Sequence, residues 1–215
     1  MVSNCRTLQI PVVLNEEPGI MEGIRVIIAE KDSQTRKKLV ETLNQAGYFV
    51  VGEAEDGMAA LKMIRSMQPE LVLTAADLPV VNGFELARII DEGRICAVVL
   101  MLDYTEKEYL NRTGDNSSVP VVFKPFDTFQ LIPVLEFACT SYIRVIELER
   151  EVSRLKKDLE TRKVVEKAKG ILMRTQGLSE QEAFRKIQQQ SMKKRTTMKK
   201  VSEAVIMAHE MSPGN

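Results

Sequence analysis

Ionisable side chains that could bind a metal ion or a phosphoryl group follow four separate apolar segments of the chain. They are Glu30, Lys31, Asp32, Asp77, Asp103 and Lys124. Carboxylate oxygens are the ligands that Mg²⁺ prefers, and a lysine ammonium binds phosphate as a point charge. If the fold brings the ends of these segments together, the chemistry to expect there is the binding of Mg²⁺ or phosphate.

Other catalytic chemistry is not indicated. His209 is the one histidine, and it lies in a helical tail without the partners of a Ser-His-Asp triad. Cys5, Cys96 and Cys139 are odd in number and too widely spaced for a metal knuckle, and the last two lie in apolar runs typical of buried residues. We therefore expect no enzyme activity, no metal and no cofactor.

A second concentration of charge is basic and lies toward the C-terminus. The net charge of the 215 residues is zero, but residues 1–140 carry 13 Lys+Arg against 20 Asp+Glu, and residues 141–215 carry 17 against 10. Most of the excess falls within residues 162–200, which hold 12 basic and 3 acidic residues. An acidic region fused to a concentrated basic one is typical of a protein that binds a polyanion.

The elements that must position these residues alternate along the chain. Apolar, β-branched runs predict strands over 24–29, 48–54, 71–76, 96–102 and 119–124. A helical pattern follows each strand, including a short helix over 106–112 and a fifth helix over 128–143. Five βα units with short connections predict a doubly wound parallel sheet. Function gathers at the carboxyl ends of such strands, where the ionisable residues lie.

Residues 25–139 resemble the receiver domains of two-component response regulators. The resemblance rests on PELVL…LPVVNGFE (69–85) and on VVFKPF (121–126). It implies a flavodoxin-like or CheY-like α/β fold, in which an acidic pair and an aspartate hold Mg²⁺, the aspartate accepts a phosphoryl group, and a Ser/Thr and a lysine contact that group. In this sequence these positions hold Glu30-Lys31, Ala75, Leu102 and Lys124, so only the lysine keeps its expected identity.

These departures predict that the receiver-like domain, assigned to residues 23–140, does not transfer phosphate. Ala75 has no nucleophile, Leu102 cannot form a hydrogen bond, and one carboxylate beside two ammonium groups is a poor Mg²⁺ site. Lys124 is instead expected to pair with Glu30. Two alternatives stay open: a two-residue slip that makes Asp77 the acceptor, and a one-residue slip that puts Asp32 in the acidic pair, although Asp32 fits a helix N-cap better. Without phosphorylation, the input would be a regulatory protein or a small-molecule ligand.

Residues 141–161 predict a coiled-coil linker, continuous with the fifth helix. Five apolar residues follow one another at heptad a/d spacing with charged residues between them, and we expect them to form a homodimer seam. They are Val145, Leu148, Val152, Leu155 and Leu159. The alternative is that this stripe packs on the chain's own receiver-like domain.

Residues 162–210 predict a compact three-helix unit. Ser179 and Glu182 form a capping box at the start of its second helix. The residues expected to face inward are Ala183, Phe184, Ile187, Met198, Val201, Val205 and Ile206. Within this unit, AKGILMRTQGLSEQEAFRKIQQQSMKKRTTMKKVSEAVI (168–206) resembles ANTAR domains, with Ser191 departing from the usual Ala. The resemblance implies an antiterminator that binds paired stem-loops in a leader mRNA, so that a terminator cannot form.

The basic residues of this unit fit RNA binding on physical grounds. The expected phosphate contacts are Lys169, Lys193, Lys194, Lys199 and Lys200. Arg174 and Arg195 could stack their guanidinium planes on bases, and Gly170 would allow a close approach. Because the unit's one aromatic residue, Phe184, is expected in the core, stacking of bases on a ring is not expected.

Three other functions compete with this interpretation. A DNA-binding regulator would need Asn, Gln or Arg along its recognition helix, and the last helix has few. A protein adaptor would dock the basic tail on an acidic partner, and a working phosphorelay receiver is opposed by Ala75. Residues 1–22 are expected to be a disordered extension, with translation starting at Met1 or Met21. No signal peptide or membrane-spanning segment is recognisable, which favours the cytoplasm.

Overall fold

The described part of the chain forms a five-stranded parallel sheet followed by helices. In the computed structural model, residues 23–106 and 119–211 are described, so the expected extension over 1–22 and most of the expected short helix over 106–112 lie outside them. The strands are β1 (Arg25–Ala29), β2 (Phe49–Ala54), β3 (Leu71–Ala75), β4 (Ala97–Asp103) and β5 (Val121–Lys124). Their order is β2-β1-β3-β4-β5, which confirms the doubly wound receiver-like sheet.

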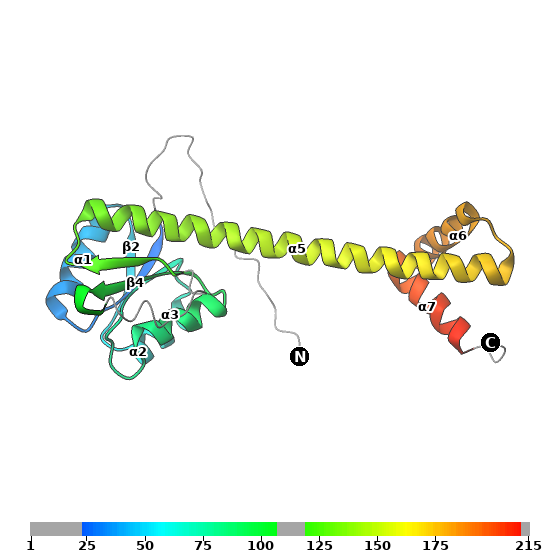
Figure 1. The fold of residues 1–215 in the computed structure, drawn as a ribbon. Helices are drawn as coiled ribbons and strands as arrows, with labels where there is room; N and C mark the ends of the chain where they lie inside the picture. The colour runs from blue at the N-terminus through cyan, green and yellow to red at the C-terminus, as the bar shows by residue number, and fades with distance from the viewer. Residues whose placement is uncertain (1–22, 107–118, 212–215) are drawn as a thin grey trace. The chain divides into compact units, whose positions relative to one another are not determined.

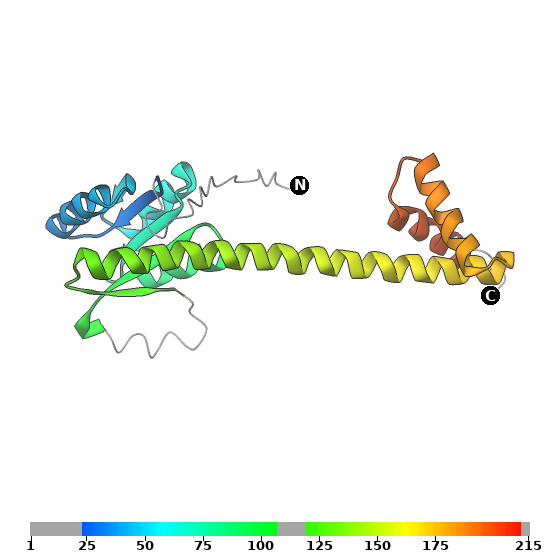
Figure 2. The same cartoon turned by 90° about the horizontal axis from the view of Figure 1, so that it is seen from above.

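Helices cover both faces of this sheet. They are α1 (Ser33–Gln45), α2 (Gly57–Met67), α3 (Gly83–Glu92) and α5 (Thr128–Gln176), and a single 3₁₀ turn, η1 (Tyr104–Glu106), follows β4. Helices α2 and α3 lie on one face, while α1 and the first part of α5 lie on the other (Figures 1 and 2). All of β3 is buried between these layers, which explains why its sequence is apolar without alternation.

Side chains at the helix starts fix where the strands hand over to the helices. The side chains of Asp32, Asp56 and Asn82 each accept a hydrogen bond from a backbone N–H three residues later, at 2.8 Å. Such caps satisfy donors that have no partner inside the helix. The predicted N-cap at Asp32 is thereby confirmed.

Gly83 ties the start of α3 to the end of β3. A Cβ atom at this position would come within 1.8 Å of the Ala75 carbonyl oxygen, and the Gly83 N–H donates a hydrogen bond of 2.8 Å to the Ala76 carbonyl. A larger residue would push the two backbones apart. The glycine therefore fixes the place of Ala75 at the carboxyl end of the sheet.

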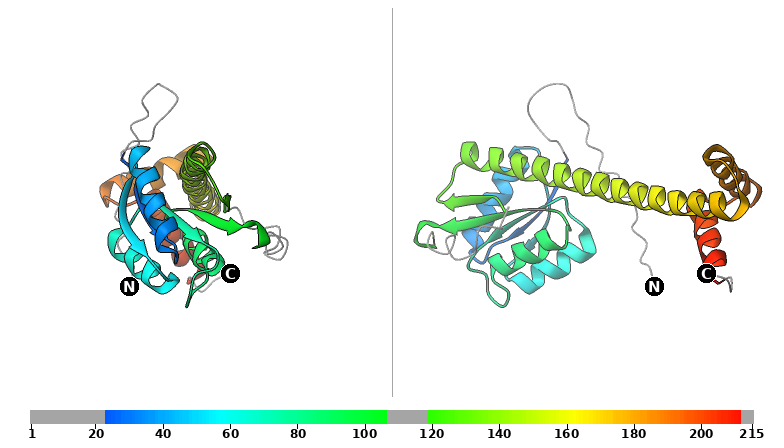
Figure 3. Two further views of the ribbon diagram at one scale, coloured as in Figure 1. Left: turned by 90° about the vertical axis from the view of Figure 1, so that its left-hand side faces the viewer. Right: turned by 45° about the vertical axis from the view of Figure 1, so that its right-hand side comes forward.

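The chain divides into two compact units, Met1–Ile146 and Glu147–Asn215, and α5 contributes residues to both. In the second unit, α6 (Glu180–Lys193) and α7 (Met198–Glu210) lie against the end of α5 (Figure 3). Its core consists of Val165, Ala168, Leu172, Ala183 and Ile187, with partly buried Leu178, Met198, Val201, Val205 and Ile206 around them. The Ser179–Glu182 capping box is present, as predicted.

One residue of the expected core is placed differently. Phe184 is 41% exposed, so the prediction that it faces inward is wrong. The buried face of α6 runs through Ala183, Ile187 and Ser191, four residues apart, and Phe184 lies one position, about 100°, around the helix from that row.

Candidate functional site

The carboxyl edge of the sheet is closed by an ion pair. Lys124, at the end of β5, donates a 2.7 Å hydrogen bond from Nζ to Oε2 of Glu30, which directly follows β1. The other carboxylate oxygen of Glu30 accepts the Asp32 N–H at 3.0 Å. Glu30 is 1% exposed and the Lys124 side chain 17%, so this is a largely buried pair with both carboxylate oxygens engaged.

The neighbouring charged residues are also paired. Lys31 forms an ion pair with Asp77, the residue that was the alternative phosphoacceptor. Asp32 caps α1, and the backbone hydrogen bond from Thr35 holds the pKa of its carboxyl below its usual value. Each of the two carboxylates that a slip in register would recruit therefore has a structural partner of its own.

These residues do not fit a magnesium ion. Mg²⁺ needs several oxygen ligands in an octahedral arrangement, whereas both oxygens of Glu30 already accept hydrogen bonds, one of them from an ammonium group. Ala75 and Leu102 are fully buried and offer no ligand. Among the described residues, no group of three or more His, Cys, Asp or Glu side chains is placed to hold a metal.

Most basic residues of the second unit, unlike the buried ion pair at the sheet edge, are exposed. Arg174, Lys193, Lys194, Arg195 and Lys200 are exposed, and Lys199 is half-buried in the first turn of α7. A Cβ atom on Gly170 would meet no atom within 4 Å, so nothing in the described chain requires a glycine there. Arg195 follows the end of α6 with a left-handed φ of 48°, which turns the chain toward α7. These residues leave open ammonium and guanidinium groups on one small helical unit.

Lys169 differs from the other lysines of this set. Its side chain is 8% exposed, and its ammonium contacts carboxylates of Glu166 at 2.8 Å and Glu180 at 2.7 Å. The hydrogen bonds that Lys169 donates to these two carboxylates raise the pKa of its ammonium. In this arrangement Lys169 joins α5 to α6, and its ammonium is not presented to a phosphate as the sequence led us to expect.

Comparison with known proteins agrees with both units. The model of the response regulator receiver domain matches residues 26–136, and that of the ANTAR domain matches residues 153–206. The transcriptional regulatory protein PdtaR of Mycobacterium tuberculosis is 38% identical over 182 residues, which cover 85% of this chain and 89% of that protein. The chain is a receiver–ANTAR response regulator.

Other matches cover little more than half of this chain. The transcriptional regulatory protein HptR of Staphylococcus aureus is 29% identical over 113 residues, 52% of this chain and 44% of that protein. Two solved receiver domains, from an HD domain-containing protein of Pseudomonas fluorescens and from a diguanylate cyclase of Desulfovibrio desulfuricans, match with TM-scores of 0.51 and 0.52. Both are 20% identical; they cover 57% and 56% of this chain and 99% and 97% of their own, and they show the shared fold.

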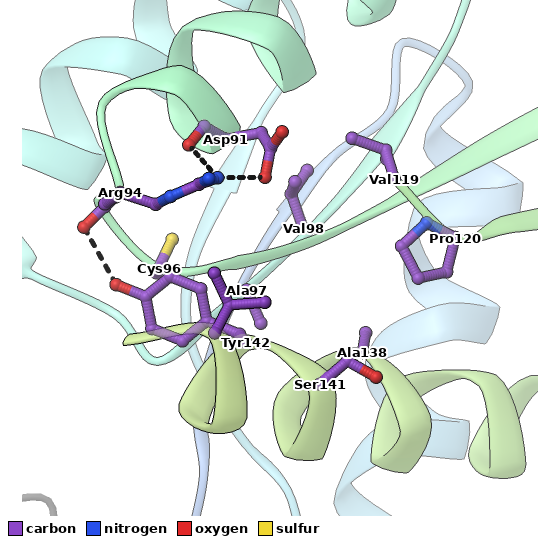
Figure 4. A pocket seen from close by; sticks show the side chains of 11 residues that line it. Asp91, Arg94, Cys96, Ala97, Val98, Val119, Pro120, Ala138, Ser141 and Tyr142 are labelled. Atoms are coloured by element: carbon purple, nitrogen blue, oxygen red, sulfur yellow. Dashed lines mark hydrogen bonds and ion pairs between the residues drawn. The ribbon is translucent and has the colours of Figure 1, made fainter. Parts of the chain in front are cut away.

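The receiver domain of this regulator also has a small pocket, which lies where β4 and β5 begin (Figure 4). Its volume is about 100 Å³, and Cys96, Pro120 and Tyr142 are among its lining residues. The Tyr142 hydroxyl donates a 2.8 Å hydrogen bond to the Arg94 carbonyl. Ligand pockets are usually at least about 300 Å³, so this one is too small for an ordinary metabolite in its present shape.

The expected dimer seam is exposed in the single chain of the regulator. The five residues Val145, Leu148, Val152, Leu155 and Leu159 are between 38% and 58% exposed. In the described part of the chain, no helix is long and apolar enough to cross a membrane.

Proposed function

We propose that this regulator is a cytoplasmic transcription antiterminator whose ANTAR domain binds stem-loops in a leader mRNA. The observation that carries the proposal is the charge of α6, α7 and the turn between them. From Glu182 to Glu203 the chain has seven Lys or Arg residues and no acidic residue in between. A folded unit with so concentrated a positive surface suits the phosphate backbone of a nucleic acid, and a relative that shares both domains is named a transcriptional regulator.

The receiver domain is proposed to act without phosphorylation. Ala75 stands where an acceptor would be, and Lys124 is held by Glu30 rather than left open toward a phosphoryl group. The residues at the carboxyl edge of the sheet then serve as a fixed scaffold. They are Glu30, Lys31, Ala75, Leu102 and Lys124. Its input is a regulatory protein or a small molecule that acts on the receiver surface.

The regulator is proposed to form a parallel homodimer through the middle of α5. In a parallel coiled coil, valine at a (Val145, Val152) with leucine at d (Leu148, Leu155) favours two strands over three or four. In that register each g residue faces the e residue five positions later in the partner, and all three such pairs join opposite charges. They are Arg144 with Glu149, Glu151 with Lys156, and Asp158 with Lys163.

The test of RNA binding starts from a pool of paired stem-loops with randomised loop sequences, enriched on the immobilised full-length protein. Binding of the enriched RNA is then compared with a scrambled loop and with duplex DNA over a salt series. We expect tight, loop-dependent binding, with a log–log salt slope of about −0.7 for each phosphate contact. Acetyl phosphate should leave the affinity unchanged.

A matched control separates specific contacts from general charge. The variant Lys193→Gln/Lys194→Gln should bind more weakly with a shallower salt slope, whereas Arg150→Gln/Lys157→Gln, at outward f positions of the coiled coil and outside α6 and α7, should keep the slope. Equal binding of stem-loop and duplex DNA would favour a DNA-binding regulator. No binding of either would favour a protein adaptor.

A further inference from the structure

Phe184 exposes an apolar ring on a helix whose other exposed residues are mostly charged or polar. Phe184 is 41% exposed on α6, and Met192, two turns later on the same side, is 68% exposed. Gln188 lies midway between them at i+4 from each, so the three side chains form one row. Large apolar side chains in such a row on a small, charged helical unit favour a ligand that covers them.

We propose that Phe184 stacks on an unpaired base of the RNA loop and that Gln188 hydrogen-bonds the edge of that base. The inference rests on the proposed RNA-binding function and names a base-contact site within it. Every base has a π face, so an exposed aromatic ring can hold it by stacking. The amide of Gln188, one turn along the helix, offers both a donor and an acceptor to the base edge.

The charges around the row favour RNA over a second copy of this chain. Arg185 lies about 60° around the helix from Gln188, and Lys194 and Arg195 follow the end of α6 just beyond Met192. Two such surfaces facing each other would bring like charges together, which costs free energy. A polyanion neutralises them, so the ring, the amide and the cations fit one nucleic-acid ligand.

The acidic residues at the start of α6 do not cancel this positive surface. Glu180 is bound to Lys169 at 2.7 Å, and Glu182 accepts hydrogen bonds from the Ser179 N–H and hydroxyl at 2.8 and 2.7 Å. Their carboxylates are therefore committed to the fold. Along the helix, Phe184 lies roughly 14 Å from Lys193, so a loop of a few nucleotides can place a base on the ring and its phosphates on the lysines.

Conservative variants separate stacking from bulk and from charge. Phe184→Leu keeps an apolar side chain but removes the π face, and Phe184→Tyr keeps the ring. With the enriched stem-loop, Phe184→Leu should bind about 5- to 100-fold more weakly at an unchanged salt slope, because stacking involves no ion release. Phe184→Tyr should bind as the unchanged protein does, and Lys193→Gln should instead lower the slope by about 0.7.

A fluorescent base locates the contact. With 2-aminopurine placed at each loop position in turn, the unchanged protein should quench the emission at one position, and Phe184→Leu should not. Thermal unfolding and sedimentation of the full-length variants show whether fold and dimer are intact. Equal affinity and equal quenching by Phe184→Leu would overturn the stacking proposal while leaving RNA binding in place.

Two other results are distinguishable from that one. If Phe184→Leu weakens the dimer as much as it weakens RNA binding, the row is an interface between copies and the stacking proposal is wrong. If the unchanged protein binds no stem-loop at all, it is the proposed function that fails, and with it the basis of this inference.

Discussion

Lys124 is the one residue of the expected phosphoryl-binding set that keeps its usual identity, while Ala75 stands at the acceptor position. If the receiver is not phosphorylated, as proposed, this lysine at the end of β5 has no phosphoryl group to bind, and its ammonium is 2.7 Å from Glu30. Glu30 is nearly inaccessible to water, so its charge needs a partner inside the protein. The pair joins the end of β1 to the end of β5 across the carboxyl edge of the sheet.

Removing one partner of this pair should be costly. We expect Lys124→Gln to lower the free energy of unfolding by about 3 kcal/mol, because it leaves a buried carboxylate without its cation. Urea denaturation of the full-length protein measures this change. The double variant Glu30→Gln/Lys124→Gln should recover much of the loss, since neither charge is then left alone. A double variant as unstable as the sum of the two single variants would contradict a direct pairing.

Single residues also show where inference from sequence ends. The spacing to Pro79 assigns Ala75 to the acceptor position, and the strand pattern assigns Leu102 to the Ser/Thr position. The Asp32 N-cap follows from its place before Ser33. Lys169 is different, because its partner Glu180 lies 11 residues away on another helix, and only the packing of α5 on α6 brings them together. The prediction for Phe184 is wrong for a related reason. Adjacent residues of a helix lie about 100° apart, so in a short amphipathic helix one can be buried and the next exposed.

The element α6 begins with two carboxylates whose ionisation supports the fold. Hydrogen bonds from Ser179 hold the pKa of Glu182 below its usual value, and Lys169 does the same for Glu180. A carboxyl with a lowered pKa in the folded state adds stability above its unfolded pKa of about 4.3, and this stability is lost as the pH falls through the folded pKa. The pKa of Lys169 is raised, so the stability that its charge adds is present below its unfolded pKa of about 10.4 and is lost as the pH rises through the folded pKa.

We therefore expect acid to destabilise α6 through these groups, with little change between about pH 5 and 10. The variant Glu182→Gln keeps the geometry of the capping box but has no charge to lose. At neutral pH the unchanged protein should melt at the higher temperature, and the difference should shrink as the pH falls from 5 to 3. Circular dichroism at the helix band follows both. A difference that stays constant with pH would mean that the Glu182 charge adds nothing.

The middle of α5 allows a test of the charge pairing proposed across the seam. In a parallel dimer, Glu151→Lys and Lys156→Glu each place like charges opposite one another twice, which should weaken each homodimer by roughly 1–2 kcal/mol, about tenfold. Mixing the two variants restores opposite charges in both pairs, so the heterodimer should predominate. Sedimentation equilibrium with one variant labelled measures this preference. A random mixture of homodimers and heterodimers would contradict the pairing of Glu151 with Lys156 across the seam.

At the scale of the whole molecule, the sequence was sufficient to assign both domains, because each has a long motif and a clear periodicity. The doubly wound parallel sheet follows from five βα units, and the helical tail from its caps and turns, whereas the strand order comes from the structure. What periodicity could not supply is which basic residues of the tail are held in ion pairs, as Lys169 is with Glu166 and Glu180, and which remain exposed.

A dimer that presents two ANTAR domains should prefer RNA with two stem-loops. Binding of the first loop raises the effective concentration of the second, so the paired RNA should bind about 100- to 10,000-fold more tightly than a single stem-loop. Leu148→Glu/Leu155→Glu places carboxylates in the seam and should give a monomer that binds one stem-loop with unchanged affinity but has lost this gain. The matched control Ser153→Glu/Lys157→Glu adds the same residues outside the a and d positions and should retain it. If the monomeric variant still preferred the paired RNA, a single ANTAR domain would have to contact both loops, and the purpose of the seam would lie elsewhere than in RNA capture.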